Sequence, residues 1–190
     1  MNRVSGGLIV AGCVGWGLLA MLDDPAIAAP PESTIEVYFS PRGGALAAVL
    51  KEVDAARSSI LVQAYSFTSA PIAESLAAAQ RRGVRVEIIL DQTKLLEEKR
   101  SQADFLAHSG VSVRVDAQHG SAHNKVLILD SQTVITGSYN FTRHAEEDNA
   151  ENLLIIRDHA LAAKYTANWK AHADHSSTYK LESGQKARGD

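Results

Sequence analysis

The stretch that most constrains the fold is a short apolar run near the middle of the chain, Val126-Leu127-Ile128-Leu129. These residues are apolar without alternation, whereas a strand that faces water on one side alternates polar and apolar residues. We therefore expect a strand over residues 123–129 that is buried on both faces and lies in the centre of a sheet. Such a strand needs neighbouring strands on both sides and helices on both faces.

Further strands and helices are expected along the rest of the chain. Alternating, β-branched or aromatic residues predict strands, and apolar residues at helical spacing predict helices. The expected strands cover 35–39, 59–67, 84–90, 111–115, 132–136 and 152–156, and the expected helices cover 45–56, 70–82, 95–108 and 158–172. The alternation of strands and helices in the first half is typical of βαβ units. The sequence therefore predicts an α/β protein, an α-β-α sandwich with a central mixed, largely parallel sheet.

The N-terminal segment has the composition of a targeting sequence. Arg3 is followed by an apolar run over 8–22 and by the small-x-small pattern Ala26-Ile27-Ala28. These features predict a secretory signal peptide over 1–28. The run from Val4 to Leu22 is nearly long enough to span a bilayer, so an uncleaved N-terminal membrane anchor is the alternative. We expect an exported protein, periplasmic or secreted, or one anchored to a membrane.

The remaining chain is expected to form a single catalytic domain over 29–175 and a polar, mobile tail over 176–190. The only cysteine, Cys13, lies in the N-terminal segment, so the mature chain would have no thiol. This excludes a disulfide framework, a cysteine nucleophile and a cysteine-ligated zinc. The net charge of −3 excludes a protein that is basic throughout. Any contact with nucleic acid would need a local basic patch.

A histidine and a lysine stand two residues apart at the start of the expected central strand, at His123 and Lys125. The period of two in a strand would place both side chains on one face. An imidazole can attack phosphorus, and an ammonium can offset the charge on the phosphate oxygens. The pair therefore predicts a site for attack on a phosphate.

The region around this pair resembles the phospholipase D superfamily. The pattern is H-x-K-x-x-x-x-D followed by G-S-x-N, here His123, Lys125, Asp130, Gly137, Ser138 and Asn140. Three further segments are similar to the small bacterial members with a single motif, namely Phe39-Ser40-Pro41 with Gly43-Gly44, Ala64-Tyr65-Ser66-Phe67 and Asn149-Ala150-Glu151-Asn152. The likeness is greatest to the Nuc-type periplasmic endonucleases. It implies a phospholipase D-like fold.

The resemblance implies a role for each motif residue. His123 would attack phosphorus and form a phosphohistidine intermediate. Lys125 and Asn140 would hold the non-bridging oxygens, and Ser138 would be a further phosphate-binding donor. Glu151 lies where the acidic partner of this family hydrogen-bonds the nucleophilic imidazole, which fixes the tautomer of the ring.

Asp130 completes the motif, and we include it in the catalytic set as structural support. At the end of the strand it could orient the turn or pair with a basic group. The resemblance implies no metal and no cofactor, because Lys125 and Asn140 would do the charge work that a metal ion does elsewhere.

The motif occurs once, whereas the reaction needs a second group that protonates the leaving oxygen and then activates water. Larger members of the family carry two copies of the motif. The resemblance to single-motif members therefore implies a homodimer in which His123 of each subunit faces a shared phosphate. A two-fold axis places the same residue on both sides of such a site.

The motif predicts hydrolysis of phosphodiesters and leaves the substrate open. The first hypothesis is a non-specific endonuclease on DNA or RNA, and the alternative is a phospholipase D that releases phospholipid head groups. A third, non-catalytic hypothesis is a phosphate-binding protein, against which the intact motif argues. In the first case a shared groove could concentrate the cations Arg42, Arg114 and Arg143.

Two further histidines, His172 and His175, have helical spacing and could in principle ligate a metal. The sequence shows no cysteine or third ligand near them. We therefore interpret them as the polar face of the last helix, and His119 as part of a loop surface.

Overall fold

A computed structural model of the chain describes residues 33–181. The expected signal peptide or anchor over 1–28 lies outside the described residues and stays a prediction. Within the described range, no helix is long and apolar enough to cross a membrane.

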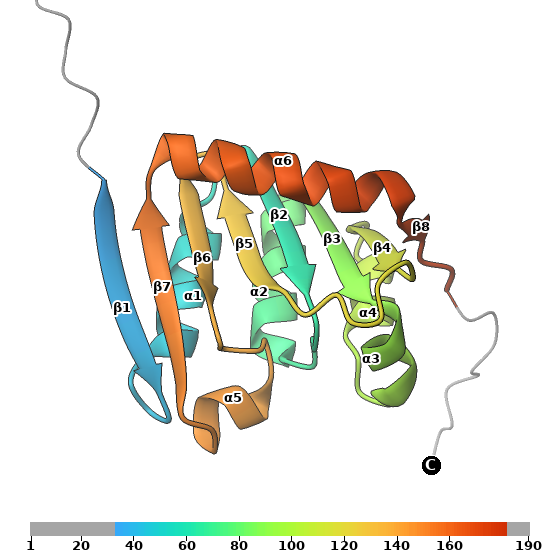
Figure 1. Ribbon diagram of the computed structural model, residues 1–190, viewed down its shortest axis with the longest axis horizontal. Coiled ribbons are helices and arrows are strands. Elements are labelled where there is room, and N and C mark those ends of the chain that lie inside the picture. Colours follow the sequence, from blue (N-terminus) through green and yellow to red (C-terminus); the bar gives the residue numbers. More distant parts are fainter. Residues whose placement is uncertain (1–32, 182–190) are drawn as a thin grey trace, which may run out of the picture. The chain divides into compact units, whose positions relative to one another are not determined.

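The described residues form one eight-stranded mixed sheet in the order β1-β7-β6-β5-β2-β3-β4-β8 (Figure 1). Its strands are β1 (Thr34–Ser40), β2 (Ser59–Ala64), β3 (Arg85–Asp91), β4 (Ser112–Asp116), β5 (Lys125–Leu129), β6 (Thr133–Gly137), β7 (Glu151–Arg157) and β8 (Ser177–Thr178). Strand β5 lies between β6 and β2, and all of its residues are buried. The prediction of a central strand buried on both faces is confirmed.

The sheet is mixed, as expected, but it is not largely parallel. Among the described strands, parallel pairing joins only β2 to β3 and β3 to β4. The other neighbours pair antiparallel. The reason lies in the connections. The first half of the chain returns through helices, whereas β5 and β6 are separated by only three residues, 130–132, which permits a hairpin and no crossover.

Helices cover both faces of the sheet, so the α-β-α sandwich is confirmed (Figure 1). The main core packs α1 (Ala45–Ala55), α2 (Ala70–Arg81) and α4 (Ala103–His108) against one face. On the other face, α6 (His159–His175) forms a second cluster in which Trp169 donates from Nε1 to the carbonyl oxygen of Val62 at 2.8 Å. The short helices α3 (Gln92–Glu97) and α5 (Arg143–Glu147) complete the described set.

Two expectations about chain segments need correction. The single helix expected over 95–108 is two helices, α3 and α4, because the backbone N–H of Gln102 bonds the carbonyl oxygen of Phe67 instead of continuing α3. The first residues of the expected mobile tail belong to the sheet. Strand β8 pairs with β4, and Tyr179 donates its N–H to the carbonyl oxygen of Val113 at 2.9 Å. These bonds pair the backbone groups at the open edge of β4, which explains why residues 177–179 have a defined structure.

Candidate active site

The residues that are expected to react lie at one end of the strands of the sheet. Lys125 opens β5 opposite the last residue of β2, and Glu151 opens β7 opposite the last residue of β1. The strand expected over 123–129 begins two residues later, so His123 lies at the end of the loop that joins β4 to β5. Asn124 still accepts a hydrogen bond from the N–H of Tyr65 at 2.8 Å. His123 is thus held just outside the sheet, with its side chain exposed.

The imidazole and the ammonium are in direct contact. The Nζ atom of Lys125 lies 3.1 Å from each ring nitrogen of His123. Tyr65 packs beside both groups. The centroid of its ring lies 4.4 Å from the centroid of the His123 ring and 4.9 Å from Nζ of Lys125. Lys125 is 7% exposed. Burial lowers the pKa of Lys125, while the charge of Glu151 acts in the opposite direction.

Glu151 has different partners from the one expected. Its carboxylate accepts hydrogen bonds from the hydroxyl of Ser138 and from Nδ2 of Asn149, the latter at 3.0 Å. No hydrogen bond joins Glu151 to His123 within residues 33–181, so the expected bond to the imidazole is not formed in the single chain. The adjacent strands β6 and β7 bring Ser138 next to Glu151, which explains the choice of partner.

Gly137 allows a close backbone approach that positions the next residues. A Cβ atom at this position would lie 2.2 Å from the carbonyl oxygen of Asn152. That oxygen accepts the N–H groups of Ser138 and Tyr139 at 3.1 and 3.2 Å. The turn leads to Asn140, whose buried Oδ1 has no hydrogen-bond partner among the described residues. The Nδ2 group of this amide is the part that can donate to a phosphate oxygen.

Asp130 lies at the opposite end of β5, and five residues of strand separate it from Lys125 by roughly 16 Å. Its carboxylate accepts the backbone N–H groups of Arg57, Ser58 and Ser59 at 2.8–3.0 Å. Burial alone would raise the pKa of Asp130, but these hydrogen bonds lower it. The structure thus places Asp130 away from the reacting groups, in the structural role that we assigned to it.

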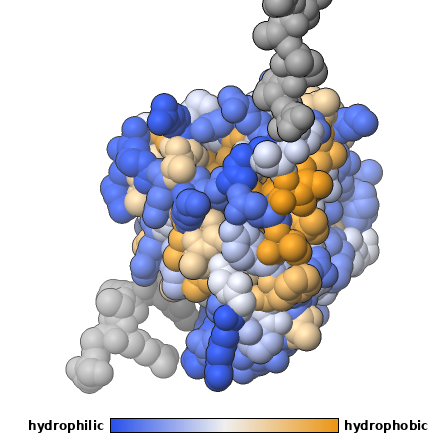
Figure 2. Space-filling model, turned by 90° about the vertical axis from the view of Figure 1, so that its left-hand side faces the viewer, coloured by the Kyte–Doolittle hydropathy of each residue, from blue (hydrophilic) through white to orange (hydrophobic). Residues whose placement is uncertain are grey.

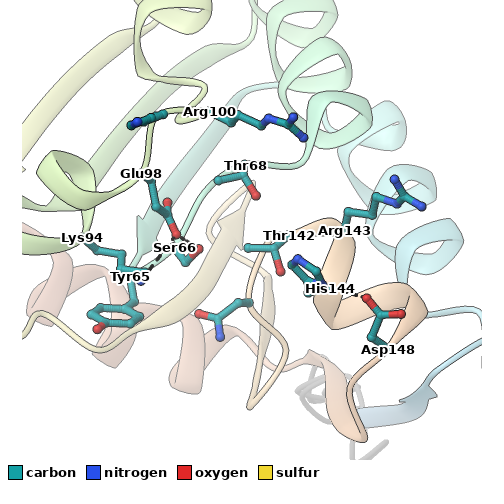
Figure 3. Close-up of a pocket in the computed structure, with 12 residues that line it drawn as sticks. Tyr65, Ser66, Thr68, Lys94, Glu98, Arg100, Thr142, Arg143, His144 and Asp148 are labelled. Carbon is teal, nitrogen blue, oxygen red and sulfur yellow. Dashed lines mark hydrogen bonds and ion pairs between the residues drawn. The ribbon is translucent and has the colours of Figure 1, made fainter.

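A cleft of about 890 Å³ opens beside the pair, between α3 and α5 (Figure 3). Tyr65 and Asn140 form part of its wall, so it adjoins the His123 site. Its charged lining includes four cations and two carboxylates, namely Lys94, Lys99, Arg100, Arg143, Glu98 and Asp148. Figure 3 shows Lys94 and Glu98 on one side and Arg143, His144 and Asp148 on the other. The cleft is suited to an extended anion.

Sequence reasoning found only part of this lining. Arg143 lines the cleft, as expected, but Arg42 does not, and Arg114 instead donates to the carbonyl oxygen of Ala173 at 3.2 Å. Lys94 in α3, and Lys99 and Arg100 in the turn after it, were missed because this segment is far from the motif in sequence. Only the strand order brings it to the site. The Asp91 carboxylate was also missed; it accepts the N–H of Ala122 at 2.6 Å and holds the loop before His123.

Comparisons with known proteins agree with this geometry. Residues 49–173 match the family described as cardiolipin synthase, PLD-like domain. This range covers more than half of the chain. The chain belongs to the phospholipase D superfamily. The resemblance inferred from the motif is thereby confirmed, and the chain is a phosphodiester hydrolase of this superfamily.

Individual relatives show how far the likeness extends. A phospholipase D of Rickettsia conorii is 42% identical over 137 residues, which cover 72% of this chain and 68% of the relative. The human mitochondrial cardiolipin hydrolase is 35% identical over 114 residues, covering 60% of this chain and 45% of the relative. Nuc, a phospholipase D family member from Salmonella typhimurium, has a similar structure with a TM-score of 0.75 and 38% identity, covering 78% of this chain and 99% of Nuc.

Proposed function

We propose that the chain hydrolyses phosphodiesters without a metal ion, through a phosphohistidine on His123, and that its substrate is DNA or RNA cut with little sequence preference. The observation that carries this proposal is the contact between His123 and Lys125, which Tyr65 joins to the wall of the charged cleft. The contact joins a nucleophile and a charge-neutralising group at one phosphate. The cleft offers cations to neighbouring phosphates of the same strand.

The first step transfers the phosphoryl group to the protein. A ring nitrogen of His123 forms a bond to phosphorus, and the bond from phosphorus to the leaving oxygen breaks. The leaving oxygen takes a proton from a general acid. Lys125 and the amide of Asn140 offset the charge on the non-bridging oxygens during this step. Water then attacks phosphorus, the general base takes its proton, and the phosphorus–nitrogen bond breaks, which restores His123.

We propose that the acid and base is His123 of a second subunit. Among the described histidines only His144, on α5, lines the adjoining cleft, and its Nδ1 lies 2.7 Å from Asp148, the residue after that helix. This proposal is supported by an apolar strip on β1, where Ile35, Val37 and Phe39 are 52–64% exposed. Figure 2 shows hydrophobic surface on this side of the molecule. The strip ends beside Ser40, which pairs with Glu151 at the site edge, and exposed apolar strips of this kind mark interfaces.

The substrate is tested by offering all candidates to one preparation. The purified protein and a His123→Ala variant are incubated in EDTA with plasmid DNA, RNA and phosphatidylcholine vesicles, at a temperature at which circular dichroism shows both folded. We expect cleavage of DNA and RNA by the wild type only. An acid-labile, base-stable ³²P label on His123 would identify the intermediate. Activity that appears only when Mg²⁺ is added would contradict the mechanism.

Release of phospholipid head groups is the second candidate function. The observation in its favour is the 42% identity to a rickettsial protein named phospholipase D. Head-group release from vesicles without cleavage of nucleic acid would establish this reading and exclude the first. The His123→Ala variant serves as the control in both assays, because both reactions use the same nucleophile.

The shared site is tested with mixed dimers. Wild-type and His123→Ala subunits carrying different affinity tags are coexpressed, and the doubly tagged dimer is isolated. If each site needs His123 from both subunits, this heterodimer retains less than about a tenth of the wild-type turnover. A heterodimer with half the wild-type rate, or an active monomer in sedimentation, would show that each subunit acts alone.

A further inference from the structure

A second cluster of histidines lies on the same sheet edge, away from the His123 site. It comprises Asp116 at the end of β4, His119 in the loop between β4 and β5, and His172 and His175 in the last turn of α6. Asp116 is completely buried, and the three rings lie with their centroids 4.9–5.3 Å from one another. Three separate segments of the chain thus bring four metal-ligating side chains together.

The ligand atoms of this cluster converge on one point. One atom of each residue lies within 4.8 Å of the corresponding atoms of the other three. Around Oδ2 of Asp116, Nδ1 of His172 lies at 2.8 Å, Nδ1 of His119 at 3.0 Å and Nε2 of His175 at 3.2 Å. Ligand atoms in a tetrahedral zinc site are separated by roughly 3.3 Å, given zinc–ligand bonds of about 2.0 Å. The three nitrogen–oxygen distances around Asp116 are close to this value, and all the ligand atoms lie within 4.8 Å of one another.

The chemistry of the donor atoms indicates which metal ions this cluster could hold. Three ring nitrogens surround Oδ2 of Asp116 within 3.2 Å, and Nδ1 of His119 also lies 3.2 Å from Oδ1. The other oxygen, Oδ1, accepts the N–H of Gln118 at 3.0 Å, an outer contact that holds the carboxylate in place. Three imidazoles and one carboxylate form a nitrogen-rich donor set. Such a set favours zinc and its neighbours over magnesium or calcium, which prefer oxygen.

We propose that Asp116, His119, His172 and His175 bind one divalent transition-metal ion of the zinc class. The sequence alone left His172 and His175 without a third ligand; the fold supplies two more. Within residues 33–181, no hydrogen bond or ring contact joins this cluster to His123, Lys125 or Asn140. The proposed role of the ion is therefore structural and separate from phosphoryl transfer.

The effect of the ion would be to fasten the loop that carries the nucleophile. Residues 117–124 connect β4 to β5 and end at His123 and Asn124. Asp91 already holds the far end of this loop through the N–H of Ala122. The ion would hold the near end through Asp116 and His119, and would join it to α6. Metal binding is then expected to raise the stability of the folded chain.

The test measures binding directly. The purified protein, freed of metal with a chelator and dialysed, is titrated with ZnCl₂ by calorimetry, and its thermal unfolding is followed with Zn²⁺ and with Mg²⁺. His119→Ala is the informative variant, because this side chain is 44% exposed and its removal leaves the core intact. His159→Ala is the matched control, since His159 is an exposed residue of the same helix, about 20 Å along its axis from His172.

We expect one Zn²⁺ per chain, a rise in Tm of roughly 5–10 °C at a hundredfold excess over Kd, and no rise with Mg²⁺. His119→Ala should weaken zinc binding at least tenfold while its metal-free Tm stays near that of the wild type, and His159→Ala should bind like the wild type. Equal, weak binding by the wild type and His119→Ala, or no stoichiometric binding, would overturn the proposal. Repeating the titration with His123→Ala separates this result from the proposed activity, because that variant should bind Zn²⁺ unchanged.

Discussion

The two histidine sites at this end of the sheet differ in how exposed their imidazoles are and in which groups surround them. His123 is exposed, contacts Lys125 and Tyr65, and lies near an open cleft. His172 and His175 instead surround the fully buried carboxylate of Asp116. An exposed imidazole next to a buried ammonium can reach a substrate, whereas the imidazoles around the carboxylate already use their ring nitrogens to contact it. The same residue type thus serves two purposes, and its surroundings decide which.

The largest expected effect separates the two sites by activity. His123→Ala should lower kcat/KM at least about 10⁴-fold, because it removes the nucleophile and, in the shared site, the acid as well. Its Tm should not change, because the side chain is exposed. Steady-state kinetics and thermal unfolding measure both, with His159→Ala as the control that should leave each value at the wild-type level. Retention of more than about 1% of activity would remove His123 from the reaction.

Replacing Lys125 tests the second member of the reacting pair. Lys125→Met should lower kcat by roughly 10²–10³-fold, the cost of removing one charge-stabilising donor. Because burial lowers the pKa of Lys125, wild-type activity should fall as the pH rises through that pKa, at a lower pH than for an ordinary lysine. Lys125→Arg keeps the positive charge, so any activity it retains should lack this alkaline decline. Identical pH profiles for the two proteins would show that Lys125 does not control the alkaline limb.

Asp130 belongs to the sequence motif but lies away from the reacting groups, so its replacement should affect stability more than activity. Asp130→Ala should lower the free energy of unfolding by about 1–3 kcal/mol, because three backbone N–H groups lose their acceptor. The lowered pKa means that this contribution is present above the pKa of the unfolded chain and is lost as the pH falls through the folded value. Denaturant unfolding at neutral and acid pH should therefore show the wild type and the variant converging in acid.

The control for Asp130 is Glu74→Ala, which removes an exposed carboxylate on α2 and should cost less than about 0.5 kcal/mol. The kcat/KM of folded Asp130→Ala should stay within a few-fold of the wild type. A loss of activity as large as that of Lys125→Met would show that Asp130 takes part in the reaction.

The smallest effect concerns the cleft. Arg100→Ala should raise KM for single-stranded DNA roughly two- to fivefold and reduce the dependence of log KM on log salt by about one phosphate contact, with kcat nearly unchanged. Arg85→Ala is the matched control, because this arginine is 70% exposed at the opposite end of β3. Equal changes in the two variants would show that the cleft does not bind the substrate.

Much of the fold and of the reacting pair could be predicted from sequence because the signals are local. The unbroken apolar run of β5 has to be buried on both faces, and the spacing of His123 and Lys125 is short. The parallel character of the sheet was overestimated because the direction of β5, β6 and β7 depends on turn lengths and strand order. For a similar reason the sequence did not show that Glu151 bonds Ser138 in the single chain, since β6 places Ser138 within its reach.

The sequence by itself determined the superfamily, the mixed α/β sheet and the chemistry of an imidazole beside an ammonium. These follow from short spacings and from the hydrophobic pattern, which local geometry translates directly into structure. Only the tertiary structure decided that Lys94 and Arg100 face the same cleft as Asn140, and that Asp116 and His119 join His172 and His175. Such contacts depend on strand order and helix packing, which bring together residues that no spacing in the sequence relates.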